Sequence, residues 1–296
     1  MSQIAAESYH RRAEGRRRRT DPSPSDAGPA VAYPGPSGSH TAAAAAALFP
    51  SAELEPLASF RAVADAVVAH AAQYGVLPIE SSLAGAVAET HDLLYERALS
   101  IVAETVQPIV HCLAGLGSLE QVRVVRSHPA AFDQCRQVLG DVTLIPAATT
   151  AGAARLVAQH DDPYEAALAS RAAAELYGLP VILDDVGDRA AFTRFVAIAA
   201  HTSLVAADAR TALSFVTDHR PGALHAAITP FAIAGIDLQR LVSRPLPQTP
   251  FRYRFDAVVA GHPLDPAVRD ALRSVGAVTR ELRVLGIYDA HEEENA

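Results

Sequence analysis

The chain contains 296 residues, of which 25 are basic and 33 acidic, so its formal net charge at neutral pH is −8. This balance argues against a general nucleic-acid binder. Half of the residues are apolar, which is enough to build a substantial core, and the length suggests two domains.

All 25 basic residues are arginine, and the chain contains no lysine. Mechanisms that require a lysine are therefore excluded, among them a Schiff base with pyridoxal phosphate and a Walker phosphate-binding loop. Asparagine occurs once, at Asn295. This compositional bias makes a missing lysine or asparagine a poor guide to chemistry.

Two cysteines, Cys112 and Cys135, are too few for a disulfide framework and lack the spacing of a zinc site. We therefore expect a reducing compartment, the cytoplasm, and no metal. The longest apolar runs, such as residues 42–49 and 196–200, fall short of the ~20 residues of a membrane helix. We expect no membrane partner.

Residues 1–28 carry six arginines and a cluster of proline and serine, with few large apolar side chains. Such a segment cannot offset the entropy cost of ordering, so we expect a disordered tail. No apolar stretch follows the arginines, so we expect no secretory or twin-arginine signal. A solvated extension and a nucleic-acid or membrane contact are the alternative interpretations.

From residue 31 onward, short apolar runs alternate with helix-length segments, which is typical of an α/β domain with covered strands. We expect strands at residues 31–33, 74–79, 99–105, 122–125, 142–145, 181–183 and 193–199. We expect helices at residues 41–49, 129–139, 151–159 and 163–177.

Clusters rich in hydroxyl groups stand at four expected junctions before helices: residues 38–41, 80–85, 127–129 and 148–151. Ligands of open α/β sheets bind beyond the carboxyl ends of strands, where helix N-termini attract anions. The alternative is simple capping, because serine and threonine are preferred at helix starts.

After a linker at residues 201–210, a second pattern begins at residue 211 with the order strand, helix, strand, strand, helix, strand. These elements are expected at residues 211–217, 221–234, 237–243, 252–259, 265–275 and 278–288. The order is that of a ferredoxin-like βαββαβ fold.

The motifs together resemble those of bacterial prephenate dehydratases and the related plant arogenate dehydratases. The resemblance covers nearly the whole chain after residue 29, and its carriers are residues 32–39, 75–85, 127–129 with 134–135, 174–179, and 193–195. It implies a two-lobed catalytic domain like a periplasmic binding protein at residues 29–200, with a central lobe at about 105–180. It also implies a lyase of phenylalanine biosynthesis that converts prephenate to phenylpyruvate without a cofactor.

Within this resemblance, Thr193 is the catalytic threonine, whose hydroxyl assists departure of the ring hydroxyl. Glu80 orients a donor, supplies a proton or pairs with an arginine. Arg194 is either a carboxylate fork or part of a structural ion pair. The remaining expected substrate-binding residues are Ser39, Ser81, Ser82, Ser127, His128, Thr149, Thr150 and Phe195, although Phe195 is also suited to packing and His128 to a helix start.

Residues 211–288 resemble an ACT regulatory domain through residues 220–224, 243–245, 253–255 and 285–288. The resemblance implies that phenylalanine binds between ACT domains of a homodimer or homotetramer. The expected allosteric residues are Gly222, Ala223, Leu224, Ser243, Arg244 and Pro245. At the position of Val242 the family usually has glutamate. A valine cannot replace the contribution of that glutamate to the effector site.

Two further departures lie in the catalytic motifs. Ser81 stands where the family usually has asparagine, and the asparagine usual shortly before Thr193 is missing from residues 188–192. A carboxamide both donates and accepts hydrogen bonds in planar geometry, and serine reaches less far. A homologue that decarboxylates prephenate without aromatising it is therefore the main alternative; arogenate dehydratase and a non-catalytic amino-acid sensor are lesser ones.

Overall fold

The computed structural model describes residues 28–97, 99–202, 206, 208–246 and 249–289. The expected tail lies outside these residues, except for Gly28. The chain forms two compact units, a first one of residues 29–90 and 104–198 and a second one of residues 91–103 and 199 onward. No helix among the described residues is long and apolar enough to cross a membrane.

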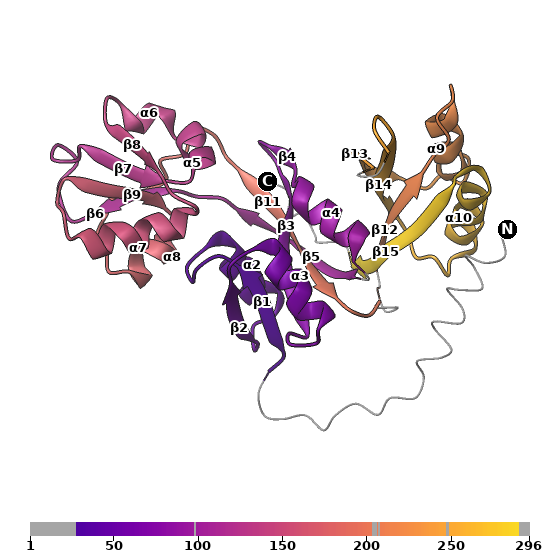
Figure 1. Ribbon diagram of the computed structural model, residues 1–296, viewed down its shortest axis with the longest axis horizontal. Coiled ribbons are helices and arrows are strands. Elements are labelled where there is room, and N and C mark those ends of the chain that lie inside the picture. Colours follow the sequence, from indigo (N-terminus) through magenta and orange to yellow (C-terminus); the bar gives the residue numbers. More distant parts are fainter. Residues whose placement is uncertain (1–27, 98, 203–205, 207, 247–248, 290–296) are drawn as a thin grey trace. The chain divides into compact units, whose positions relative to one another are not determined.

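The first unit contains two sheets (Figure 1). In one of them the strand order is β5-β11-β3-β1-β2, with β1 parallel to β2 and β3, and β11 antiparallel to β3. Its elements are β1 (Ala30–Pro34), α2 (His40–Leu48), β2 (Glu53–Leu57), α3 (Phe60–Val68), β3 (Tyr74–Ser81), β4 (Gly85–Ala86), β5 (Ser100–Pro108) and β11 (Phe192–Ala199). Helix α4 (Ala88–Glu96) begins in this unit, but residues 91–96 of it and residues 100–103 of β5 belong to the second unit.

Helices α2 and α3 cover opposite faces of this sheet. Val76 packs in a core cluster with Ala44 and Ala45 of α2. The neighbouring Gly75 faces the other way, because a Cβ there would meet Val63 and Val67 of α3. Successive residues of a strand point to opposite faces, so the positions on β11, and those on β3 up to Pro78, can be assigned to the α2 face or the α3 face.

The second sheet of this unit has the strand order β10-β6-β9-β7-β8. Its elements are β6 (Cys112–Gly115), β7 (Val124–Ser127), α5 (Pro129–Gln134), α6 (Arg136–Leu139), β8 (Thr143–Pro146), α7 (Thr150–His160), β9 (Glu165–Ala169), α8 (Arg171–Leu176) and β10 (Val181–Leu183). Side chains alternate along β9, so that Ala167 and Ala169 face one core cluster, and Ala166 and Leu168 the other.

The second unit contains β12 (Ala209–Val216), α9 (Ala223–Ile233), β13 (Leu238–Pro245), β14 (Tyr253–Ala260), α10 (Pro266–Val278) and β15 (Glu281–Asp289). The strand order is β13-β14-β12-β15, and its neighbouring strands are antiparallel. This is the expected ferredoxin-like fold. The overall expectation of an α/β protein is confirmed.

One predicted element is wrong. Residues 163–177 were expected to form a single helix, but they contain strand β9 and the short helix α8. Every residue of β9 is buried, and its alanines fit closely between two other strands of the sheet. Tertiary burial on both faces has overridden the helix propensity of alanine. The helix expected at 129–139 is also split, into α5 and α6, at Cys135.

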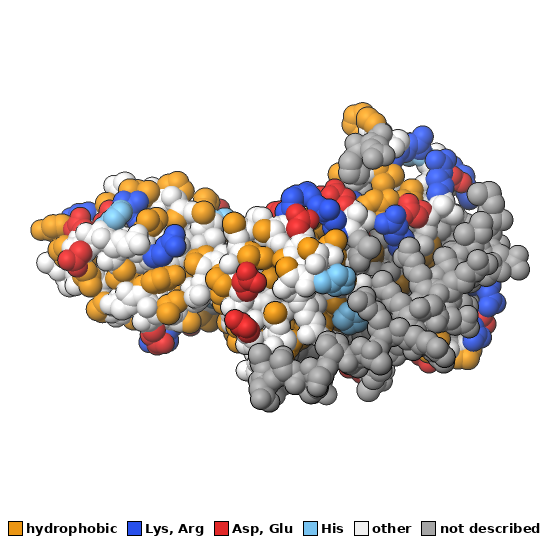
Figure 2. All heavy atoms as spheres, turned by 60° about the horizontal axis from the view of Figure 1, so that its bottom comes forward, with side chains coloured by type: hydrophobic (Ala, Val, Ile, Leu, Met, Phe, Trp, Pro, Cys, Tyr) orange, Lys and Arg blue, Asp and Glu red, His pale blue; other side chains and the backbone are white. Residues whose placement is uncertain are grey.

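Basic and acidic side chains are interspersed on the surface. On the face drawn in Figure 2, most basic side chains of the described residues lie beside acidic ones. The exposed pairs Arg136–Asp133 and Arg171–Asp184 are examples of this arrangement. Exposed pairs of this kind contribute little to stability, about 0–1 kcal/mol each.

Candidate active site

Two helix N-termini of the first unit converge on Gly35. The Ser39 hydroxyl caps α2 by accepting a hydrogen bond from the Ala42 amide at 3.2 Å, and the Thr149 hydroxyl caps α7 by accepting from Gly152 at 2.9 Å. A Cβ on Gly35 would lie 3.8 Å from Thr149 Cγ2 and 4.0 Å from Ser39 Oγ. The capping interpretation is correct for both residues, and the two caps also face one small region.

The loop that carries Ser39 is fixed by the N-terminus of α8, which belongs to the second sheet of the same unit. The Ser170 hydroxyl donates to the Gly38 carbonyl at 2.7 Å. Gly38 has a φ of +81°, and a Cβ there would lie 2.9 Å from the Ala173 Cα atom. Glycine is therefore required at this position both for its backbone conformation and for its close approach to α8.

Thr193 lies on β11 directly opposite Ser81 on β3. Residues opposite each other in an antiparallel pair project from the same face. Thr193 also shares the α2 face with Phe195, which packs in the core cluster with α2. Beside this pair, Ser82 and Phe192 exchange hydrogen bonds, Ser82 N to Phe192 O and Phe192 N to Ser82 Oγ, both at 2.9 Å.

Glu80 does not share that face. It pairs with Arg194, the next residue along each strand, so the two project from the α3 face. Of the three expectations for Glu80, the ion pair with an arginine is the one found, with 3.5 Å between its Oε2 and Arg194 Nε. Its membership of one site with Thr193 stays a prediction.

Arg194 makes ion pairs with two carboxylates. Its Nη1 lies 3.0 Å from Glu104 Oε1, and its Nε lies 3.5 Å from Glu80 Oε2. The side chain of Glu104 is only 1% exposed. Of the two expectations for Arg194, the structural ion pair is the one found. Glu104 was missed by the sequence reasoning, although an acidic residue within an apolar strand was an available signal.

Three other expected substrate-binding residues have structural roles. Ser127 is fully buried, and its hydroxyl donates to the Leu168 carbonyl at 2.6 Å. His128 caps the short helix α5, because its Nδ1 accepts from the Ala130 amide at 3.2 Å. Phe195 is 2% exposed within the core. Ser127 and Phe195 are buried, so their roles here are structural. His128 is exposed, and its contact with substrate stays a prediction.

Of the other expected substrate-binding residues, Thr150 is the first residue of α7, beside the Thr149 cap. Ser81 also accepts from the amides of Leu83 and Ala84, both at 3.3 Å, in the turn that follows β3. An accepting hydroxyl keeps its hydrogen for a ligand. The structure therefore brings together Ser39 and Thr149 around Gly35, and Ser81 with Thr193 on the α2 face.

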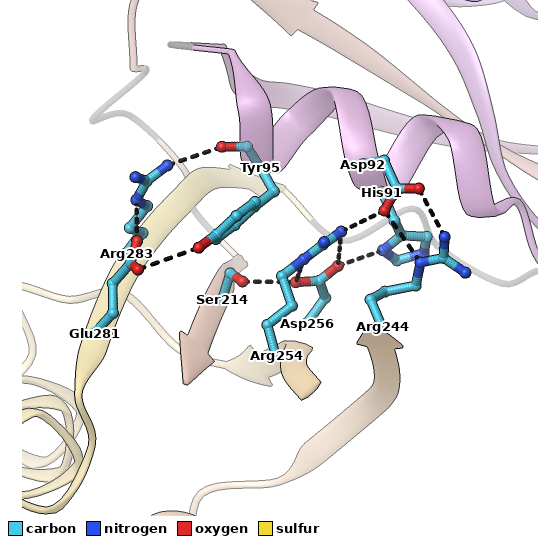
Figure 3. Close-up of polar contacts among 9 residues, drawn as sticks. All are labelled: His91, Asp92, Tyr95, Ser214, Arg244, Arg254, Asp256, Glu281 and Arg283. Atoms are coloured by element: carbon cyan, nitrogen blue, oxygen red, sulfur yellow. Dashed lines mark hydrogen bonds and ion pairs between the residues drawn. The ribbon is translucent and has the colours of Figure 1, made fainter. Parts of the chain in front are cut away.

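The expected allosteric residues lie in the second unit. Gly222 is left-handed with a φ of +77° and caps α9, whose first residues are Ala223 and Leu224. Ser243, Arg244 and Pro245 end β13. The Arg244 side chain points to Asp92 of α4, as Figure 3 shows. The same network contains the buried Arg254, which also donates to Asp92.

A comparison with protein-family models matches residues 31–203 to the family described as "PDT: Prephenate dehydratase". The matched residues include both sheets of the first unit. The chain belongs to the prephenate dehydratase family.

Relatives within the prephenate dehydratase family are similar over most of the chain. The chain is 34% identical to arogenate dehydratase/prephenate dehydratase 2 of Arabidopsis thaliana, covering 87% of this chain and 72% of that protein. It is 35% identical to the bifunctional chorismate mutase/prephenate dehydratase of Aquifex aeolicus, with 87% and 73% covered.

Solved structures agree with this membership. A prephenate dehydratase from Arthrobacter aurescens, solved in complex with L-Phe, is 30% identical with a TM-score of 0.82, covering 90% of this chain and 92% of that one. A second structure, of GqqA, described as a novel type of quorum quenching acylase, is 31% identical with a TM-score of 0.80, covering 88% and 98%.

Proposed function

We propose that this protein is a prephenate dehydratase, a lyase that converts prephenate to phenylpyruvate. The observation that carries the proposal is the placement of the Thr193 and Ser81 hydroxyls on the α2 face of the sheet. The helix N-termini of α2 and α7 converge at Gly35 in the same unit. Family membership supplies the class of substrate.

Prephenate carries two carboxylates, so the site must bind negative charge. The N-termini of α2 and α7 present backbone N–H groups and the positive ends of two helix dipoles. Ser39 and Thr149 use an oxygen lone pair to cap these helices, so each hydroxyl hydrogen remains able to donate to a carboxylate. This arrangement binds an anion without Arg194, which is paired with Glu104 and Glu80.

In the reaction, the bond from the ring to its carboxylate breaks and releases CO2. The electron pair moves into the ring as the bond to the ring hydroxyl breaks, and the departing oxygen takes up a proton to leave as water. We assign the Thr193 hydroxyl to a hydrogen bond with that oxygen. A neutral hydroxyl is a weak acid, so its contribution is stabilisation of developing charge in a preorganised site.

A second candidate is decarboxylation of prephenate without loss of the hydroxyl. Both departures from the family's usual asparagines lie near Thr193: Ser81 lies opposite it, and residues 188–192 directly precede it. Two groups suited to holding the departing hydroxyl are thus replaced close to the threonine. Protonation of the diene would then replace aromatisation.

The product identifies the reaction. The purified full chain is incubated with prephenate, away from acid because prephenate also aromatises there without enzyme, and the product is identified by ultraviolet spectrum and mass. Phenylpyruvate supports the dehydratase, and a hydroxylated dihydro product supports the decarboxylase. Unchanged prephenate contradicts both; parallel incubation with arogenate then tests the arogenate dehydratase, and calorimetry with phenylalanine the non-catalytic sensor.

We also propose that residues 211–288 form an ACT regulatory domain that binds phenylalanine in a homodimer or homotetramer. Its support is the βαββαβ order and the L-Phe complex of the Arthrobacter relative. Calorimetry with phenylalanine tests the binding of the effector, and light scattering tests the oligomeric state. A cytoplasmic location is consistent with Cys112 and Cys135, which are both free and buried.

A further inference from the structure

We propose that Glu104 is a positioning residue for the reaction, acting through Arg194 on the strand segment that presents Thr193. The inference rests on the proposed function, because it concerns the same site. It goes further by assigning a role to a buried carboxylate on the α3 face, away from the substrate.

The side chains of Arg194 and its two partners connect three adjacent strands. Strand β11 lies between β5 and β3 in the sheet. From β11, Arg194 reaches Glu104 on β5 at 3.0 Å and Glu80 on β3 at 3.5 Å. One guanidinium therefore ties the central strand to both of its neighbours, in addition to the backbone ladder.

This tie acts where the ladder is irregular. The register between β11 and β3 shifts between Arg194 and Phe195. Beyond the shift, toward the start of β11, only Thr193 and Arg194 are paired with β3. A bulge bends a strand and locally disrupts its pairing. The hydrogen bonds between Ser82 and Phe192 hold the far end of this short segment, and Arg194 adds a side-chain tie at the irregularity itself.

Glu104 is the partner that fixes the orientation of Arg194. Its side chain is 1% exposed, whereas that of Glu80 is 36% exposed and partly solvated. A buried carboxylate is retained only when it is paired, and its hydrogen bond to a cation is strong and directional. Glu104 therefore holds the guanidinium in one place, while Glu80 adds a weaker contact near solvent.

The test is a set of variants measured for prephenate consumption. Glu104→Gln keeps the shape and removes the charge, and we expect kcat to fall roughly ten- to a hundredfold with KM changed less than about twofold. Glu104→Asp, which keeps the carboxylate, should retain an intermediate kcat. Glu55→Gln, on an exposed position of β2 in the same sheet, is the matched control and should be unchanged.

A combination with Thr193→Ala separates positioning from simple stability. If Glu104 acts through Thr193, then Glu104→Gln has no further effect on the residual rate of Thr193→Ala, because no hydroxyl remains to be positioned. If Glu104 had only a structural role, Glu104→Gln would lower the folded fraction, which circular dichroism measures. It would then reduce the rate equally in the wild type and in Thr193→Ala.

The inference is overturned if Glu104→Gln and Glu104→Asp keep kcat within about twofold of the wild type, or if the loss is the same with and without Thr193. If Glu104→Gln does not fold, Glu104→Asp is measured instead, alone and combined with Thr193→Ala, and the same comparison tests the inference. Failure of the proposed function looks different: the wild-type chain would then leave prephenate unchanged.

Discussion

Arg244 and Asp92 form a two-point ion pair: Arg244 Nε donates to Asp92 Oδ1 at 3.2 Å, and Nη2 donates to Oδ2 at 2.7 Å. Arg244 belongs to a motif expected to sense phenylalanine, yet its guanidinium is bound to a residue of α4. An effector carboxylate would have to compete with Asp92 for it. The main role of Arg244 is therefore to hold residues 91–96 of α4 within the second unit (Figure 3).

The network predicts an effect of Asp92→Asn on stability. Burial raises the pKa of Asp92, but hydrogen bonds from Arg244 and Arg254 outweigh it and lower the pKa overall. The ionised Asp92 therefore stabilises the folded state at pH values above the ordinary pKa of a carboxyl group. This stabilisation is lost as the pH falls through the lowered pKa. Because solvent partly screens Asp92, we expect Asp92→Asn to cost only about 1 kcal/mol near neutral pH and to flatten the acid dependence of stability.

Urea unfolding at neutral and acidic pH measures this effect. Glu89→Gln, an exposed acid in the first turn of the same helix, should cost only a few tenths of a kcal/mol. An Asp92→Asn variant whose free energy of unfolding follows the wild type at both pH values would contradict the assigned role.

Glu165 gives a second prediction about stability. The hydrogen bond from Arg126, opposed by burial and aided by His160, lowers the pKa of Glu165 to about 2. A lowered folded-state pKa means that this stability is complete above about pH 4.5 and disappears as the pH falls toward 2. Glu165→Gln should lower the free energy of unfolding by about 2 kcal/mol at neutral pH.

Chemical unfolding at several pH values follows the contribution of Glu165. The exposed pair Asp133–Arg136 provides the comparison, and Asp133→Asn should change stability by less than about 0.5 kcal/mol. Equal effects of the two substitutions would mean that the partly buried triad of Arg126, Glu165 and His160 adds nothing beyond a surface pair.

Thr193 gives a prediction about catalysis. Thr193→Ala should lower kcat roughly a hundred- to a thousandfold, because the donor to the departing oxygen is lost, and should leave the fold intact. Thr193→Ser keeps the hydroxyl and should retain most of the rate. Thr143→Ala, on an exposed position of β8, serves as the control for steady-state kinetics. Wild-type turnover in Thr193→Ala would refute the assignment.

Two helix caps give a prediction about binding. Ser39→Ala and Thr149→Ala each remove a hydroxyl near Gly35, so KM for prephenate should rise several-fold more than kcat falls. Each also costs about 1 kcal/mol as a lost cap. Ser59→Ala removes the equivalent cap of α3, where Ser59 accepts from Ala62, and should lower stability without changing KM. Unchanged KM in both site variants would place the anion elsewhere.

Gly38 gives a prediction about the loop between β1 and α2. Gly38→Ala introduces a Cβ that would lie 2.9 Å from backbone of Ala173, in a left-handed conformation. The loop must then move, so we expect a loss of about 2–4 kcal/mol and a higher KM. Gly178 has a φ of +70°, but a Cβ there would meet nothing within 4 Å. Gly178→Ala therefore measures backbone strain alone, which we expect to cost about 1 kcal/mol. Similar thermal stability in both variants would exclude the steric part.

Local features of this protein follow from the sequence by itself. Serine or threonine before an alanine-rich run predicts the starts of α2 and α7, because a cap bonds to amides only three residues away. The βαββαβ order of the second unit follows from the period of its apolar residues. The motifs at residues 32–39, 75–85 and 193–195 likewise indicate the family without any tertiary information.

Distant partners and the choice of sheet face needed the tertiary structure. Strand β9 reads locally as helix, and only burial between two strands makes it a strand. Ser81 and Thr193 belong to motifs far apart in the sequence, and only the register of β3 and β11 places them opposite each other. Arg194 meets Glu104 across 90 residues and Arg244 meets Asp92 across 152. No local pattern encodes such pairs, because folding brings together charges whose spacing along the chain is arbitrary.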